Sequence, residues 1–326
     1  MSEKEIKMRT LGKSGIQVTE MGLGLWAVGG DAWGPTDDNE SLSAIDASLD
    51  AGVNFFDTAD LYGGGHSEEL LGKAMKDRRE RFVVATKIGL RDFDRDKNLS
   101  AYDTVQKLVS GVESNLQRLQ TDYIDIIQSH ISFRDPSLEC FLEGFQILQR
   151  AGKVRAYGVS TSNYQYLQEF NADDGCATLQ IDFSILNRTA ENEILPYCQE
   201  KDIGVIIRGP LAMGILTGKF NPEKKFGQFD WRRSWQENPD EREVYLQDLQ
   251  KVEKLKALTN GRSLAQVALQ FVLSKKSVSV VIPGSKTTGQ VIENVGAAQL
   301  PPLSAQDLSY IETITPRGGG RKIWPA

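Results

Sequence analysis

Cysteine and histidine are scarce in this chain. Its 326 residues include three cysteines, Cys140, Cys176 and Cys198, which lie far apart and form no CxxC pair. Such spacing is not a disulfide framework, so we expect free thiols in a reducing compartment. The two histidines, His66 and His130, do not have the spacing of zinc ligands. This argues against a zinc-dependent barrel hydrolase and predicts no metal site.

The chain also lacks long apolar runs and an excess of basic residues. No stretch approaches the roughly 18 apolar residues of a membrane span, and the first residues show no apolar run like that of a signal peptide. Lys and Arg number 38 against 44 Asp and Glu, which gives a formal charge of −6. An acidic chain has no general attraction for phosphodiester backbones. We therefore expect a cytoplasmic protein that binds neither membranes nor nucleic acid.

The pattern that is present is an alternation of short apolar runs with longer amphipathic segments. The apolar runs predict strands at 21–26, 54–59, 82–89, 123–128, 156–161, 178–184, 204–211 and 278–284. The amphipathic segments predict helices at 39–50, 67–76, 102–119, 138–150, 164–171, 191–201, 241–259 and 263–274. Near-continuous apolar strands are typical of parallel sheets. The alternation therefore predicts a (β/α)8 TIM barrel, with residues 1–326 as a single domain.

Three segments lie outside this alternation. Residues 8–11 and 16–19 flank Gly12-Lys13-Ser14-Gly15 and predict a short β-hairpin ahead of the barrel. Residues 212–240 form a long polar and aromatic segment, and connections of this length are usually functional or disordered. We expect the glycine-rich tail at 317–322 to be mobile.

A glycine motif at 22–27, Gly-Leu-Gly-Leu-Trp-Ala, formally fits G-x-G-x-x-A. In dinucleotide-binding domains a helix begins at this motif, and its N-terminus meets the pyrophosphate. Here Gly29-Gly30 follow, and Gly34-Pro35 would end any helix. The motif therefore predicts no Rossmann domain.

Ionisable side chains follow three consecutive predicted strands. Asp57 lies near the end of the second strand with Tyr62 just beyond it, Lys87 lies near the end of the third, and His130 follows the fourth. The carboxyl ends of barrel strands meet at one face, where barrel enzymes place their catalytic residues. Because an unpaired buried charge is costly, we predict an Asp57–Lys87 ion pair.

These four residues suit the proton transfer that accompanies carbonyl reduction. A tyrosine with a pKa of about 10 is a weak acid at neutral pH, and a nearby ammonium lowers that pKa. Lys87 would act in this way on Tyr62, Asp57 would orient Lys87, and His130 would bond the carbonyl or orient the substrate. Taken singly, Asp57 could cap a turn, Lys87 could form a structural ion pair and Tyr62 could be an anchored loop aromatic. Their occurrence together favours a catalytic role.

Several motifs extend beyond these residues. They are Gly22-Leu23-Gly24-Leu25-Trp26, Asp57-Thr58-Ala59-Asp60-Leu61-Tyr62-Gly63, Ala85-Thr86-Lys87, Arg118-Leu119-Gln120-Thr121-Asp122-Tyr123-Ile124-Asp125, Gly158-Val159-Ser160, Leu216-Thr217-Gly218-Lys219, Ile282-Pro283-Gly284-Ser285-Lys286 and Glu293-Asn294. With them, almost the whole chain resembles the aldo-keto reductase superfamily. Residues 208–211 and 282–286 resemble a bacterial branch near the inositol-utilisation and general stress reductases. The resemblance implies a (β/α)8 barrel with an N-terminal hairpin across its bottom. It also implies a catalytic tetrad of Asp57, Tyr62, Lys87 and His130.

The resemblance further implies a cofactor, NADP with NAD possible, bound extended over the barrel mouth. Ser160 and Gln180 match positions that hold the nicotinamide carboxamide, although Gln180 could instead be an interior polar group satisfied by its neighbours. The residues that the resemblance assigns to the cofactor are Ser160, Gln180, Arg208, Leu211, Gly214, Leu216, Lys219, Gly284, Ser285, Lys286, Gln290, Glu293 and Asn294.

The chain departs from many members of that superfamily at three places. Two residues intervene between Ser160 and Asn163, where an asparagine often follows the serine directly. Arg208 replaces a Tyr or Trp that stacks on the nicotinamide; a guanidinium can also stack, or it could bind phosphate or substrate. Gln290 replaces an arginine for the 2′-phosphate. Lys286 could supply that charge, or be a solvated lysine.

The function implied is NADP(H)-dependent interconversion of aldehydes or ketones with alcohols by hydride transfer, with Tyr62 as proton donor. The substrate pocket is expected at Trp26 and Trp33, the loop after His130 and the segment 212–240. We expect a small carbonyl or alcohol substrate and a monomer or weak oligomer. The alternative is a nucleotide-binding redox sensor that resembles the potassium-channel β subunits of the same superfamily.

Overall fold

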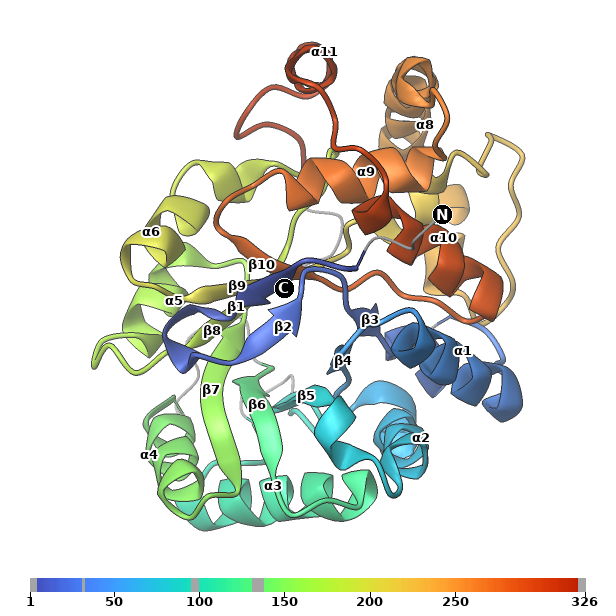
Figure 1. Ribbon diagram of the computed structural model, residues 1–326. Coiled ribbons are helices and arrows are strands. Elements are labelled where there is room, and N and C mark those ends of the chain that lie inside the picture. The colour runs from blue at the N-terminus through green and yellow to red at the C-terminus, as the bar shows by residue number, and fades with distance from the viewer. Residues whose placement is uncertain (1–4, 31–32, 95–99, 131–137, 322–326) are drawn as a thin grey trace.

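Eight parallel strands form the wall of a barrel in the computed structural model, which describes residues 5–30, 33–94, 100–130 and 138–321 (Figure 1). They are β3 (Leu23–Gly24), β4 (Phe55–Asp57), β5 (Val83–Ile88), β6 (Ile124–Ser129), β7 (Val154–Ser160), β8 (Thr178–Asp182), β9 (Gly204–Arg208) and β10 (Val278–Val281). Parallel bridges Met21–Val281 and Gly24–Gly284 join the two ends of the strand order. The (β/α)8 barrel predicted from the alternation is confirmed.

Helices surround this wall in Figure 1. They are α1 (Asp38–Asp50), α2 (His66–Met75), α3 (Val105–Leu119), α4 (Leu138–Arg150), α5 (Tyr164–Phe170), α6 (Ile194–Glu200), α9 (Leu264–Leu273) and α10 (Thr288–Gln299), with α8 (Pro239–Leu255) and α11 (Ala305–Ile314) farther out. Helix α3 shows why such segments are helical. Its buried Leu108, Val112 and Leu116 recur every four residues on one face. The Thr104 side chain caps its N-terminus by accepting a hydrogen bond from the Lys107 N–H.

The barrel interior has two layers because side chains alternate along each strand. The lower layer is apolar and is formed by Phe55, Ala85, Ile126, Ala156, Ile206 and Val280. Two residues further along four of these strands stand Asp57, Lys87, Gln128 and Arg208. Polar groups are thereby gathered at the carboxyl ends of the strands, above an apolar floor.

The predicted hairpin covers the opposite end of the barrel. Strands β1 (Met8–Thr10) and β2 (Gln17–Thr19) pair antiparallel, and Leu11, Ile16 and Val18 pack against the lower layer. The turn needs Gly12, whose φ is +51° and whose added Cβ would lie 2.2 Å from the Gly204 nitrogen. The hairpin therefore lies against the start of β9 and closes the bottom of the barrel.

The segment 212–240 is folded. It contains 3-10 turns at Ala212–Thr217 and Trp231–Arg233 and the short helix α7 (Ser234–Glu237). Its aromatic rings pack on one another: the Trp235 ring centroid lies 5.4 Å from that of Trp231 and 5.7 Å from that of Phe226. The segment is an aromatic cluster that packs against the body of the barrel.

The expectation of a mobile tail is wrong for residues 317–321, and Lys322 lies outside the described residues. The Arg321 guanidinium pairs with Asp248 at 2.7 Å, and the Gly319 carbonyl accepts from the Arg188 N–H at 2.9 Å. Gly320 has φ +84°, and a Cβ there would lie 2.1 Å from the Leu186 carbonyl oxygen. The glycines therefore serve a close approach of two backbones.

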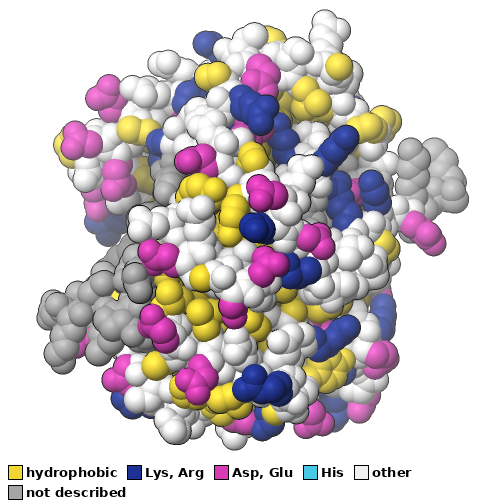
Figure 2. Space-filling view, turned by 90° about the vertical axis from the view of Figure 1, so that its left-hand side faces the viewer, with side chains coloured by type: hydrophobic (Ala, Val, Ile, Leu, Met, Phe, Trp, Pro, Cys, Tyr) yellow, Lys and Arg dark blue, Asp and Glu magenta, His cyan; other side chains and the backbone are white. Residues whose placement is uncertain are grey.

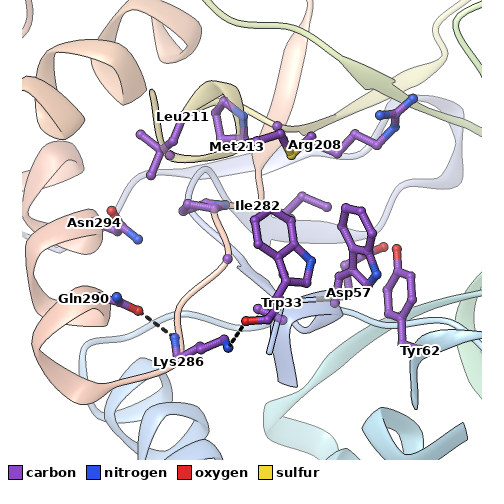
Figure 3. Close-up of a pocket in the computed structure, with 18 of the residues that line it drawn as sticks. Trp33, Asp57, Tyr62, Arg208, Leu211, Met213, Ile282, Lys286, Gln290 and Asn294 are labelled. Carbon is purple, nitrogen blue, oxygen red and sulfur yellow. Dashed lines mark hydrogen bonds between the residues drawn. The ribbon is translucent and has the colours of Figure 1, made fainter. Parts of the chain in front are cut away.

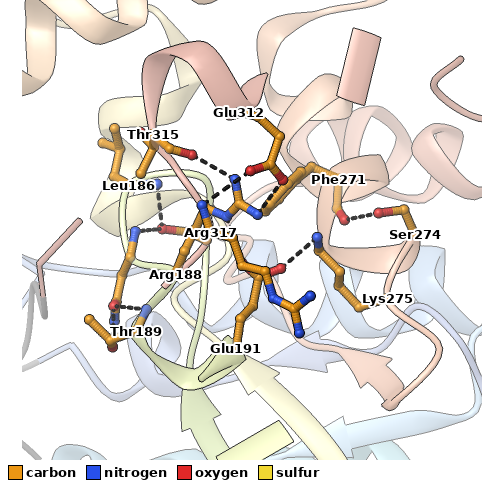
Figure 4. Close-up of polar contacts among 12 residues, drawn as sticks. Leu186, Arg188, Thr189, Glu191, Phe271, Ser274, Lys275, Glu312, Thr315 and Arg317 are labelled. Carbon is orange, nitrogen blue, oxygen red and sulfur yellow. Dashed lines mark hydrogen bonds and ion pairs between the residues drawn. The ribbon is translucent and has the colours of Figure 1, made fainter. Parts of the chain in front are cut away.

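A buried arginine explains why the C-terminal region docks (Figure 4). Arg188 is fully buried and donates to Glu191, to Glu312 and to the Thr315 carbonyl, each at 2.6 Å. Its guanidinium also lies 5.2 Å from the centroid of the Phe271 ring of α9. One side chain thus joins the segment after β8 to α9 and α11.

Charges of both signs are interspersed on the face shown in Figure 2. Among the described residues, no helix combines the length and apolar character needed to span a membrane.

Candidate active site

A cavity of about 910 Å³ opens above the polar layer (Figure 3). Most residues predicted for the site line it: Trp26, Trp33, Asp57, Tyr62, His130, Ser160, Gln180, Arg208, Leu211, Gly214, Lys219, Gly284, Lys286, Gln290, Glu293 and Asn294. Lys87 is fully buried and bonds Asp57 and Tyr62 of the cavity wall. Leu216 and Ser285 are also buried and are not part of the lining. Side chains from opposite ends of the sequence therefore face one space.

Lys87 is the centre of the polar layer. Its Nζ donates to Asp57 Oδ1 at 2.6 Å, to the Thr58 carbonyl at 2.8 Å and to the Tyr62 hydroxyl at 3.1 Å. The predicted ion pair of Asp57 and Lys87 is confirmed. All three ammonium protons have acceptors, which is the condition for holding a buried lysine charged.

Burial and neighbouring charges shift the pKa values in this layer in opposite directions. Burial alone would lower the pKa of Lys87, but the charges of Asp57 and Tyr62 and the hydrogen bonds to both outweigh it, so that pKa is raised. Burial raises the pKa of Asp57, and Lys87 and Gln180 act against it. The sequence predicts a lowered pKa for Tyr62, and this is wrong in sign: burial raises the Tyr62 pKa more than Lys87 lowers it. Tyr62 is therefore a protonated phenol at neutral pH.

His130 is neutral for the same reason. Burial lowers its pKa well below the ordinary value, and the charges of Lys87 and Arg208 lower it further. Its ring lies edge-on to Tyr62, with centroids 6.0 Å apart. Nδ1 is buried with no hydrogen-bond partner among the described residues. A neutral imidazole beside the phenol can donate one hydrogen bond to a ligand atom.

A second buried polar group supports the backbone that carries Tyr62. Asp60 is fully buried, its backbone N–H donates to the Lys87 carbonyl at 3.1 Å, and its Oδ2 accepts from the Tyr102 hydroxyl at 3.2 Å. Nearby, Glu68 is also fully buried and pairs with Arg118 at 2.7 Å. Burial and the charge of Glu68 raise the pKa of Asp60 to about 7.

This raised pKa makes the stability of the protein pH-dependent. An unfolded Asp ionises near pH 3.8 and the folded Asp60 near pH 7, so between these values the folded chain holds a proton that the unfolded chain has lost. The free energy of unfolding therefore falls as pH rises through this window, by about 4 kcal/mol from this group. Urea denaturation of Asp60→Asn should show a smaller fall than wild type between pH 4 and 8, whereas exposed Glu69→Gln should not. Parallel curves for wild type and Asp60→Asn would contradict this expectation.

Two further polar side chains of the cavity wall, Gln180 and Arg208, lie on β8 and β9. Gln180 donates to Asp57 Oδ2 at 2.7 Å, so it is an interior group with a partner as well as a lining residue. Arg208 Nη2 is buried without a hydrogen-bond partner among the described residues. Asn163 caps α5 by accepting from the Tyr166 N–H and does not line the cavity.

The far end of the cavity lies at the start of α10 (Figure 3). Lys219 Nζ lies 3.6 Å from Glu293, and Asn294 donates to Ser285 Oγ at 3.0 Å. The backbone N–H of Lys286 donates to Gln290 Oε1 at 2.7 Å. Its ammonium points the other way and donates to the Trp33 carbonyl at 2.8 Å.

Sequence reasoning missed a cation of this wall, Arg232. Its guanidinium lies 4.7 Å from the Trp33 ring centroid and 5.0 Å from that of Phe226, and it pairs with Asp230 at 2.6 Å. The signal in the sequence was a basic residue directly after a tryptophan, Trp231-Arg232, in a segment that has no periodicity.

Two further predictions concern the loop after His130 and the absence of a metal site. The loop after His130, residues 131–137, lies outside the described residues. Within the described ranges, no group of three or more His, Cys, Asp or Glu side chains could hold a metal ion.

Residues 20–316 match the model of the aldo/keto reductase family. The chain is 34% identical to aldo-keto reductase YhdN of Bacillus subtilis, over 94% of this chain and 92% of that protein. It is 32% identical to the NADH-specific methylglyoxal reductase of Escherichia coli, over 90% and 94%. The structure of glycerol dehydrogenase AKR11B4 from Gluconobacter oxydans superposes with a TM-score of 0.80, at 30% identity, over 100% and 99%.

Proposed function

The chain belongs to the aldo/keto reductase family, and we propose that it interconverts aldehydes or ketones with alcohols using NADP(H). The observation that carries the proposal is the buried triangle in which Lys87 donates to both Asp57 and the Tyr62 hydroxyl. Such an arrangement is costly to bury, and it lies at the carboxyl end of the strands, where barrel enzymes place their chemistry.

The cavity fits an extended dinucleotide. The cavity has a volume of about 910 Å³ and extends from Asp57 and Tyr62 to the start of α10, where the cations Lys219 and Lys286 line it. The Arg208 guanidinium lines the same cavity as Asp57 and Tyr62, and its Nη2 has no hydrogen-bond partner among the described residues. A planar ring bound against it would find a stacking partner and a donor. A bound nicotinamide would supply the hydride for the carbonyl carbon. We assign Ser160 and Gln180 to its carboxamide and the 211–219 segment to the pyrophosphate.

The chain's own residues supply the proton and the positioning. Tyr62 holds its proton at neutral pH and donates it to the carbonyl oxygen, while Lys87 stabilises the phenolate left behind. Neutral His130 donates a hydrogen bond to the same oxygen. Trp26 and Trp33 line the cavity near Tyr62, and the ring centroids of Trp26 and Tyr62 lie 6.0 Å apart. We place the substrate against these rings.

Steady-state turnover tests the proposal. The purified protein should oxidise NADPH in the presence of a reactive aldehyde such as a nitrobenzaldehyde. Submicromolar nucleotide affinity without turnover across a broad carbonyl panel would instead favour the redox-sensor alternative.

Cofactor preference provides a second test at Lys286. Removing a charge-assisted phosphate contact costs about 1.5–3 kcal/mol, and because the ammonium must first leave the Trp33 carbonyl we expect the lower limit, about tenfold in affinity. Lys286→Ala should therefore raise the Kd for NADPH about tenfold and leave the Kd for NADH nearly unchanged. Isothermal titration of both cofactors measures this. Equal losses for the two would mean that Lys286 does not contact the 2′-phosphate.

A further inference from the structure

Trp33 is held in the cavity wall by residues of the cofactor end. It forms an antiparallel bridge with Asp230, and its ring lies under the Arg232 guanidinium. Its carbonyl and that of Gly34 accept from Lys286 Nζ at 2.8 and 3.5 Å. Its ring also packs edge-on against Trp26, with centroids 5.0 Å apart. A movement of the Lys286 side chain can therefore be transmitted through Trp33 to Trp26, where we place the substrate.

Lys286 spans the distance between these two ends (Figure 3). Its backbone is fixed by Gln290 at the start of α10, while its side chain points toward Trp33. The main chain can thus stay in place while the ammonium changes partner.

We propose that Lys286 couples cofactor identity to the shape of the carbonyl pocket. Its ammonium holds the Trp33 and Gly34 carbonyls when the cofactor end carries no 2′-phosphate, and moves to the phosphate when one is bound. Trp33 is then released from this contact and shifts against Trp26. The inference rests on the proposed use of NADP(H) and assigns to this residue a second role, in substrate specificity.

The exchange of partners is favourable on electrostatic grounds. A charge-assisted hydrogen bond to phosphate is roughly twice as strong as one to a neutral carbonyl. Lys286 also lies in an unfavourable setting, because burial and then the charge of Arg232 lower its pKa, with only Asp230 acting against them. A bound phosphate dianion offsets both effects.

Fluorine NMR of protein labelled with 5-fluorotryptophan tests the coupling without turnover. Trp33→Phe assigns the Trp33 resonance. Adenosine 2′,5′-bisphosphate should bind more tightly than 5′-AMP and should shift that resonance, whereas saturating 5′-AMP should leave it in place. In Lys286→Met neither nucleotide should move it. Lys224→Met removes an exposed cation of the same region that does not line the cavity, and should respond like wild type.

Steady-state kinetics provides the matching functional readout. In wild type the KM for one aldehyde should differ between NADPH and NADH by roughly 2- to 10-fold, the range of one hydrogen bond. In Lys286→Met the two KM values should agree.

Two results would overturn the coupling. One is a Trp33 resonance that stays in place, or moves equally with both nucleotides, although the 2′-phosphate strengthens binding. The other is equal affinity for the two nucleotides. Either result leaves carbonyl reduction itself intact, which is decided by turnover.

Discussion

Replacing Tyr62 by Phe should remove nearly all carbonyl reduction and leave NADPH binding nearly unchanged. The substitution deletes only the hydroxyl that accepts from Lys87 at 3.1 Å, and loss of a positioned general acid costs roughly 100- to 10,000-fold in rate. Lys87 keeps Asp57 and the Thr58 carbonyl as acceptors, so the fold should persist. Turnover and the NADPH Kd, measured on the same preparation, test both parts.

Tyr102→Phe is a matched control. It removes a phenolic hydroxyl that bonds Asp60 and does not line the cavity. This variant should keep most of the wild-type turnover. If Tyr62→Phe turned over as fast as wild type, Tyr62 would not be the proton donor.

Replacing Lys87 by Met should cost both turnover and stability. The variant leaves the Asp57 carboxylate buried without its cation, and breaking a buried pair in this way costs about 3–5 kcal/mol. Protonation of Asp57 relieves that cost, so the loss should be larger at pH 8 than at pH 5. Urea denaturation at the two pH values measures it, alongside turnover under the same conditions.

The double variant Asp57→Asn, Lys87→Met separates the two effects. Without either charge, the layer no longer contains an unpaired ion, and replacing both partners of a buried pair is often near neutral for stability. Stability should largely return while turnover stays lost, because no ammonium remains to stabilise the Tyr62 phenolate. A double variant as unstable as Lys87→Met would show that lost packing, and not the lone carboxylate, causes the instability.

The part of the site that could be predicted from sequence depends on regular strands. Because side chains alternate along a strand, Asp57 and Lys87 each stand two residues beyond an inward apolar residue, Phe55 and Ala85. Their burial then demands pairing, and the structure shows that pair.

The part of the site that could not be predicted depends on where long side chains point and on the relative size of opposing effects on a pKa. The ammonium of Lys286 reaches back to the Trp33 carbonyl, and no local pattern records a contact between residues so far apart in the chain. The sign of the Tyr62 pKa shift depends on how far burial outweighs one charge. The tail glycines suggested flexibility by their composition. Their docking could not be foreseen, because the backbone that they approach, at Leu186, lies far away in the sequence.

Barrel closure also determines when this protein can finish folding during its synthesis. Strand β3 and the residues just before it contact the last part of the wall through two bridges, Met21–Val281 and Gly24–Gly284. A ribosome-bound chain that lacks β10 therefore exposes two unpaired strand edges. Such edges template pairing with other chains, and short edge strands reduce that hazard. Strand β3 has only two residues. The same brevity that limits the closure to two bridges therefore also limits one of the two edges, that of β3, which an incomplete chain presents to its neighbours.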